Sequence, residues 1–505
     1  MVSNENVDPE YDVIVIGAGI GGLTCAAALV KGGKKVLVCE QHSKPGGYVT
    51  SFERKGFIFD GGTQSLSWSC WILPILKDLM ILDRSKLVKI SYQIVTPDVD
   101  LKLESIQTIV SELKRMFPED SNGIETYFRT IREFIDDLTK IAPSFMDVAI
   151  PTNRWKKILF YLKLPICHFS FLVKMIKYSK TTAKDLVDKY ITNEKLKFLL
   201  SSQSSIIIEA MNWYWFIEDN WWPMGGMQKL ANLFAEVIKE GGGIVSLGMK
   251  VEKILIENGK AVGVSLENGK EIRSRFVVSN ADYKQTFTKL VDSIHLEKEF
   301  IERVQKAKVS NSMLSVYLGV DLDKEALKKI RVQHVICNLA YERKSIKDPD
   351  FYKYCSDFWV CVPSLVDESL APKGKSVIII QASASYNYMD KWQTENGKRT
   401  KAYKELKQKV ANELIATAER IIPGLSKHIV VMEVATPLTM ERYTLNTNGA
   451  TTGWGEDFHK GFFGGSIRTP IKNLYTVGHW SFNLGGVAPA MLAGKKAAET
   501  ILERI

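Results

Sequence analysis

A glycine-rich turn between a buried strand and a helix is the feature that most constrains what this chain can form. Residues 11–40 read YDVIVIGAGIGGLTCAAALVKGGKKVLVCE. The apolar runs 13–16 and 36–39 are typical of parallel strands buried on both faces. Between them, 23–30 is small and apolar, as expected of a helix that packs closely on a sheet. The segment therefore predicts a βαβ unit at the start of an α/β fold.

The turn and the end of the second strand predict a dinucleotide site. Gly17 permits the tight turn, Gly19 lets the backbone approach a pyrophosphate, and Gly22 allows the helix to pack closely on the strand. The helix N-terminus adds N–H groups and a positive dipole end for phosphate. Glu40 can accept both hydroxyl protons of an adenosine ribose, and its charge would repel the 2′-phosphate of NADP. The alternative is a glycine turn in an unrelated α/β unit.

Composition narrows the class of protein further. With 505 residues, 45% hydrophobic and 25% charged, the chain is too apolar for a disordered protein and too large for a disulfide scaffold. The seven cysteines are odd in number and form no CxxC pair, so we expect a reduced, intracellular compartment and no thiolate zinc site. The polar, acidic segment 1–11 is not typical of a signal peptide. No uncharged apolar run reaches about 18 residues, so we expect no transmembrane helix.

The residues after Glu40 favour a flavin over a nicotinamide. Gly46-Gly47 follows this acid, and an aromatic segment, 57–59, then leads into Asp60-Gly61-Gly62. This order resembles the amine oxidase and phytoene desaturase superfamily of FAD enzymes. The resemblance implies that Gly46-Gly47 lies along the pyrophosphate and ribityl chain, and that 61–64 passes near the isoalloxazine. Bare backbone suits close approach to a flat ligand.

Four more segments carry the same resemblance, in matching order along the whole chain. They are 222–227 before a helix at 229–239, 248–267 with a hairpin turn at Asn258-Gly259, 276–282, and 473–488 before a helix to Ile501. The branch it most resembles holds bacterial phytoene desaturases, carotenoid cis–trans isomerases and all-trans-retinol saturases. It implies an α/β fold in which a Rossmann-type FAD-binding domain is interleaved with a mixed-sheet plus helical substrate domain, as in glutathione reductase and amine oxidases.

The resemblance also implies a set of residues that bind FAD without a covalent link. These are Gly17, Ala18, Gly19, Gly21, Gly22, Glu40, Gln41, Gly46, Gly47, Tyr48, Gly62, Val251, Ala281, Gly478, His479, Gly486 and Val487. One of them departs from the family pattern, because many members have Gly-Asp where this chain has Gly478-His479. An imidazole in place of a carboxylate removes a negative charge beside the cofactor, which favours the reduced, anionic flavin.

The predicted domains are discontinuous. The FAD-binding domain takes 1–92, 222–290 and 432–505, and the substrate and membrane-association domain takes 93–221 and 291–431. Within the second, the pattern predicts helices at Lys324 to Lys329 and Lys401 to Arg420, and strands at 355–363 and 376–384.

The excess positive charge is concentrated in one segment. Residues 154–180 hold seven Lys or Arg and no acid, and removing them takes the net charge from +10 to +3. Apolar side chains recur there at helical spacing, which predicts a basic amphipathic element in a membrane interface. The protein is then expected on the cytoplasmic face of a membrane. The alternative is a core helix pair with a solvated basic side, and nucleic acid is disfavoured because no nucleic-acid-binding motif accompanies the charge.

The chemistry that fits these features is FAD-dependent desaturation, saturation or cis–trans isomerisation of a polyene or isoprenoid lipid. An aromatic cluster at 213–222 is open to two interpretations, a wall for such a chain or a domain-interface core. The only catalytic candidates are weak ones, His479 and Glu441, and no histidine spacing predicts a metal. Two alternatives remain. They are a flavin amine or porphyrinogen oxidase, and a flavin-free escort of prenylated GTPases with the same fold.

Overall fold

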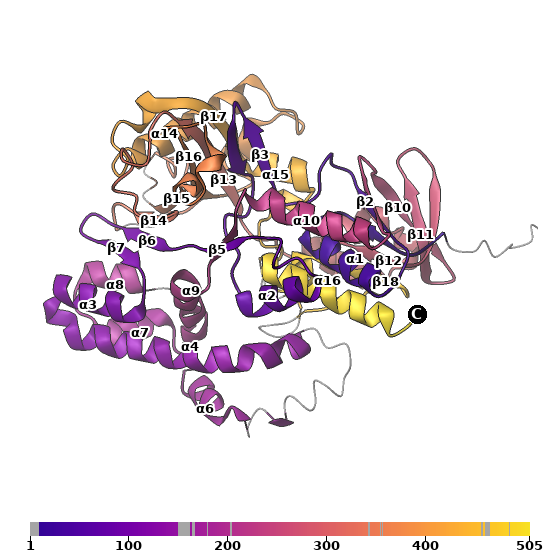
Figure 1. Ribbon diagram of the computed structural model, residues 1–505, viewed down its shortest axis with the longest axis horizontal. Helices are drawn as coiled ribbons and strands as arrows, with labels where there is room; N and C mark the ends of the chain where they lie inside the picture. Colours follow the sequence, from indigo (N-terminus) through magenta and orange to yellow (C-terminus); the bar gives the residue numbers. More distant parts are fainter. Residues whose placement is uncertain are drawn as a thin grey trace, which may run out of the picture.

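The computed structural model consists of two seven-stranded sheets and a helical arm (Figure 1). It describes residues 10–149, 162–163, 167–178, 180–201, 205–341, 344–353, 355, 357–455, 458–459, 465–483 and 485–505, without the side chains of 142–149. Much of the predicted basic segment, 154–161, 164–166 and 179, lies outside the described residues.

The first sheet is the predicted Rossmann-type unit. Its strand order is β10-β11-β12-β1-β2-β9, with β18 also paired to β12. Val13 pairs in parallel with Val36 on one side and with Phe276 on the other, so β1 is central and buried on both faces. The strands are β1 Tyr11–Ile16, β2 Val36–Glu40, β9 Ile244–Leu247, β10 Val251–Glu257, β11 Lys260–Leu266, β12 Glu271–Ser279 and β18 Leu474–Thr476.

Three helices lie beside this sheet: α1 (Ile20–Lys31), α10 (Met227–Glu240) and α16 (Val487–Leu502) (Figure 1). The backbones of α1 and α16 almost touch, since a Cβ on Gly494 would lie 2.2 Å from the carbonyl oxygen of Gly21. The small residues of both helices permit this approach. It brings the C-terminal part of the chain against the glycine-rich turn at its start.

The predicted hairpin is confirmed. Asn258 and Gly259, with φ of 50° and 73°, turn β10 into β11. The first part of β12 then pairs antiparallel with β11, and its second part runs parallel to β1. One long strand thus joins the hairpin to the parallel sheet.

The second sheet is mixed, with the order β17-β13-β16-β15-β14-β6-β7. Its strands are β6 Tyr92–Val95, β7 Asp100–Leu103, β13 Ser312–Val320, β14 His334–Asn338, β15 Asp357–Cys361, β16 Ser376–Ala384 and β17 Ile429–Ala435. The strands predicted at 355–363 and 376–384 are therefore present, and the predicted fold class is confirmed. The predicted domain boundaries at 92/93 and 431/432 fall within the strands β6 and β17. The division into domains stays a prediction.

The two predicted helices of this region differ in outcome. The longer one is confirmed as α14, Lys401–Ala418. The prediction at Lys324 to Lys329 was wrong, because the segment forms turns only. Six residues are too few to offset the cost of helix nucleation, and buried Leu327 holds the segment against the second sheet's core instead.

The helical arm contains α4 (Ser121–Ala149), α6 (Phe169–Lys177) and α9 (Ile206–Glu218), with α3 Ile106–Met116, α7 Ala183–Tyr190 and α8 Glu194–Leu200. The predicted aromatic cluster at 213–222 is divided between two hydrophobic cores. Trp213 on α9 and Trp222 on β8 (Trp221–Pro223) are buried in cores, as the core interpretation expected. Within the described part of the chain, no helix combines the length and the apolar character needed to cross a membrane.

Candidate cofactor site

A cavity of ≈ 750 Å³ lies where the C-terminal ends of β1, β2 and β12 meet the N-terminus of α1. It is lined by all of the predicted FAD-binding residues except Ala18, Gly22 and Gly62. These three lie behind the lining. For example, a Cβ on Gly22 would lie 2.3 Å from the carbonyl oxygen of Gly17, as close helix-on-strand packing requires. The structure thus brings together residues that are more than 400 positions apart in the chain.

The glycines of this cavity surround a side chain that sequence reasoning passed over, Asn280. A Cβ on Gly19 would lie 2.6 Å from Asn280 Nδ2, and Cβ atoms on Gly21 and Gly478 would lie 2.8 and 2.7 Å from its Oδ1. The glycines therefore make room for this amide as well as for a ligand. Asn280 follows β12 directly, at the edge where ligands bind in such sheets, and this position was the signal available for it.

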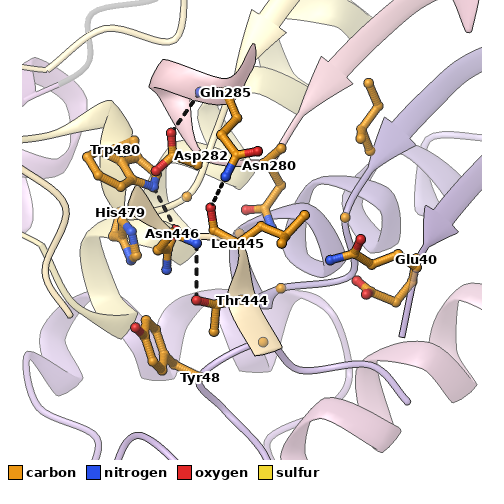
Figure 2. Close-up of a pocket in the computed structure, with 18 of the residues that line it drawn as sticks. Glu40, Tyr48, Asn280, Asp282, Gln285, Thr444, Leu445, Asn446, His479 and Trp480 are labelled. Atoms are coloured by element: carbon orange, nitrogen blue, oxygen red, sulfur yellow. Dashed lines mark hydrogen bonds between the residues drawn. The ribbon is translucent and has the colours of Figure 1, made fainter. Parts of the chain in front are cut away.

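Glu40 marks one end of the cavity (Figure 2). Its carboxylate accepts hydrogen bonds from the backbone N–H of Ala18 at 2.7 Å and of His42 at 2.8 Å. One bond to each oxygen fixes the orientation of the group and leaves lone pairs to accept further donors. The arrangement fits a ribose diol, as the sequence predicted. Val251, predicted to meet the adenine, lines the cavity as well.

His479 and Tyr48 mark the opposite end (Figure 2). Their ring centroids are 6.3 Å apart, and the Tyr48 hydroxyl donates to the carbonyl oxygens of Gly449 and Ala450. Loss of solvent lowers the pKa of His479 to about 4 and raises that of Tyr48 to about 12. Both rings are therefore neutral near pH 7. His479 Nε2 is buried without a hydrogen-bond partner among the described residues.

A strap formed by residues 443–449 crosses between these two ends (Figure 2). The Thr447 N–H donates to the buried carboxylate of Asp282 at 2.7 Å, the Gln285 amide donates to the Leu445 carbonyl, and the Trp480 indole donates to Asn446. Burial raises the pKa of Asp282, and the backbone N–H groups it accepts from oppose that rise. No sequence signal placed the strap here, because its anchors come from two other segments of the chain, 282–285 and Trp480.

Glu441, the other weak catalytic candidate, does not line the cavity. Its carboxylate accepts from the Tyr386 hydroxyl at 2.7 Å and from the Asn448 N–H at 3.2 Å, so it supports the strap from behind. Asp60 is also engaged, by Ser51, Trp222 and the Met227 N–H. Within the described ranges, no three His, Cys, Asp or Glu side chains are grouped closely enough to hold a metal ion.

These observations fit a flavin dinucleotide. Glu40 would hold the ribose, the α1 N-terminus and Gly19 the pyrophosphate, and the segment from Tyr48 to His479 the ring end. The absence of a Cβ at Gly19, Gly46 and Gly47 leaves bare backbone on the lining, as close approach of a pyrophosphate requires. When bound there, FAD would supply hydride or electron transfer, and the chain's own groups would bind and orient it.

Comparison with known proteins gives matches over nearly the whole chain. The model of the family described as flavin containing amine oxidoreductase matches residues 20–502. Chloroplastic prolycopene isomerase of Daucus carota is 30% identical, over 97% of this chain and 80% of that protein. All-trans-retinol 13,14-reductase of Danio rerio is 26% identical, over 99% and 87%. Putrescine oxidase bound to putrescine has a TM-score of 0.60 at 14% identity, over 98% and 99%, which shows the shared fold alone.

Proposed function

The chain belongs to the flavin-containing amine oxidoreductase family, and from this premise we propose that it is an FAD-dependent enzyme acting on a polyene or isoprenoid lipid. Its reaction would be saturation, desaturation or cis–trans isomerisation of a conjugated chain. Two of its relatives are named for reactions on prolycopene and on all-trans-retinol, both of which are polyenes. Their similarity covers almost all of this chain, which supports the substrate class.

The observation that carries the proposal is that the described residues at the His479 end of the cavity offer no base of ordinary strength with a free acceptor. Because the pKa of His479 is lowered to about 4, its imidazole is a weak base, and Tyr48 keeps its proton near pH 7. The carboxylate of Asp282 already accepts from the backbone N–H groups of Gln285 and Thr447. An amine substrate needs a group that accepts or relays its proton. A polyene does not, because its conjugated system delocalises developing charge. The residues of this end would exclude water and orient the ring relative to the substrate.

An anaerobic titration tests the proposal. The purified FAD-loaded protein is mixed, oxidised or pre-reduced, with a carotenoid series and with retinol, and both the flavin absorbance and the product are followed. Loss of the oxidised flavin band with a more saturated polyene indicates a desaturase. Reoxidation of the reduced form as a double bond disappears indicates a saturase, and geometric change with the flavin still reduced indicates an isomerase.

Two other outcomes would contradict the proposal. Bleaching by simple amines or a porphyrinogen, with no response to any polyene, would favour the amine or porphyrinogen oxidase alternative, for which putrescine oxidase supplies the shared fold. A protein that binds no flavin and captures a prenylated peptide would favour the escort alternative. An oxidised flavin absorbs at roughly 450 nm. Absorbance of the pure protein in this region therefore excludes the escort alternative before any substrate is added.

A further inference from the structure

Helix α6 lies on the outer side of α4, away from both sheets (Figure 1). It is amphipathic, yet none of its residues is fully buried. A surface helix of a globular protein normally turns its apolar stripe toward the core. In α6, part of the apolar surface faces outward instead.

The side of α6 that faces the protein is held by polar and aromatic contacts. Lys174 donates to Asp137 on α4 at 2.9 Å, and their side chains are 19% and 12% exposed. Ser170 donates to the same carboxylate at 3.4 Å. Phe171 and Tyr178 pack against the core of the arm. These positions share one helical face, and together they fix which face points outward.

The outward face is apolar. Phe169, Val173 and Ile176, spaced four and three residues apart, are 68%, 46% and 77% exposed. Lys177 and Lys180 are exposed beside them, and the sequence from 154 to 180 contains no acid. Asp137, which contacts α6, lies on the opposite face of that helix and is paired with Lys174. A contiguous exposed apolar stripe on a surface helix marks a site of interaction.

We propose that the outward face of α6 docks on an anionic lipid bilayer. The charge pattern selects this partner, because a stripe of Phe, Val and Ile beside exposed lysines matches the acyl boundary and the headgroups of such a surface. A hydrophobic protein partner would match the stripe and leave the lysines unused. The inference is independent of the reaction proposed above and concerns only where the enzyme meets a membrane.

Vesicle sedimentation of the full-length, FAD-loaded protein tests the proposal. The vesicles contain phosphatidylcholine alone or with phosphatidylserine. Phe169→Ser/Val173→Ser/Ile176→Ser should lower partitioning about a hundredfold. Lys177→Glu/Lys180→Glu should lower it at least about thirtyfold, on phosphatidylserine vesicles only and less at high salt. The matched controls are Ile294→Ser and Lys270→Glu, which change exposed residues far from α6 in sequence and should bind like the parent.

Each remaining outcome overturns the proposal. Binding that neither set of α6 variants changes would place the membrane contact elsewhere in the chain. The parent protein could instead fail to bind phosphatidylserine vesicles and form dimers, with the apolar triple variant monomeric. That result would identify the face as a self-association surface. Equal thermal melting of all variants shows that the comparison concerns folded protein, which the exposure of the changed side chains leads us to expect.

Discussion

The Rossmann-type sheet and the helical arm position their functional groups by opposite means. Around the cavity, backbone does the positioning, because glycines admit Asn280 and backbone N–H groups hold Glu40. In the arm and the second sheet, side chains do it, as Lys174 does for α6. The first kind of site is intolerant of one added methyl group. The second kind tolerates changes in shape and responds to changes in charge.

The largest expected effect is that of a single methyl group in the sheet region. A Cβ on Gly21 would lie 2.7 Å from the Gly478 backbone nitrogen, so an added methyl group must push the backbone after β18 away from α1. Gly21→Ala should lower the free energy of unfolding by about 3 kcal/mol, measured by chemical denaturation. Gly33→Asn at the end of the same helix is the control, because a Cβ there meets nothing and Asn tolerates the left-handed φ of 76°. Equal stability of the two variants would refute the backbone argument.

Next in size is the effect of Glu40 on FAD affinity. Glu40→Ala removes an acceptor for two backbone N–H groups and for the ribose, and should weaken FAD by about 1.5–3 kcal/mol in a fluorescence titration of the apoprotein. Glu40→Gln keeps the size of the side chain and one acceptor oxygen, and should lose less. If both variants bind FAD like the parent, the ribose lies elsewhere.

A titrating group in the second sheet should produce a pH-dependent effect. His334 on β14 is buried beside Cys361, and loss of solvent lowers its pKa from 6.5 to about 4. The unfolded chain binds the proton first as the pH falls, so stability present above pH 6.5 is lost progressively toward pH 4. His334→Gln should remove up to about 1.4 kcal/mol per pH unit of that slope, with the exposed His295→Gln as control. Buried His479 should retain a slope of its own.

The smallest expected effect tests the attachment of α6. Lys174→Met leaves Asp137 without its ion pair in a partly buried place and should cost about 1 kcal/mol. Hydrogen exchange of the backbone amides at 169–177 should speed up while α1 stays protected. Lys306→Met breaks an exposed pair with Glu302 and should change little. Faster exchange across the whole protein would show that α6 is part of the main cooperative unit.

What could be predicted from the sequence follows the same division. The strand–turn–helix unit, the Asn-Gly hairpin and α14 were predictable because neighbouring residues determine them. The strap over the cavity was not, because it is held by two segments far from it in the sequence, the pair Asp282 and Gln285 and the indole of Trp480. The outward apolar face of α6 was not predictable either, because the periodicity of the helix is the same whichever side packs against α4. The short segment at Lys324 was predicted from periodicity alone, and its contacts with the second sheet's core prevailed.

The Asn280 side chain enclosed by glycines makes several positions of this chain interdependent in evolution. An alanine at position 19 or 478 meets the same amide, so either change requires a smaller side chain at position 280 first. A glycine or alanine at 280 would relieve the contact with the amide at positions 19 and 478 and open a mutational path that is closed in the present sequence. An alanine at 21 would still meet the Gly478 backbone nitrogen at 2.7 Å, and one at 478 would still carry the strain of a φ of 90°. Substitutions at these positions should therefore show strong epistasis with position 280, and the order in which they are introduced should decide which of them survive.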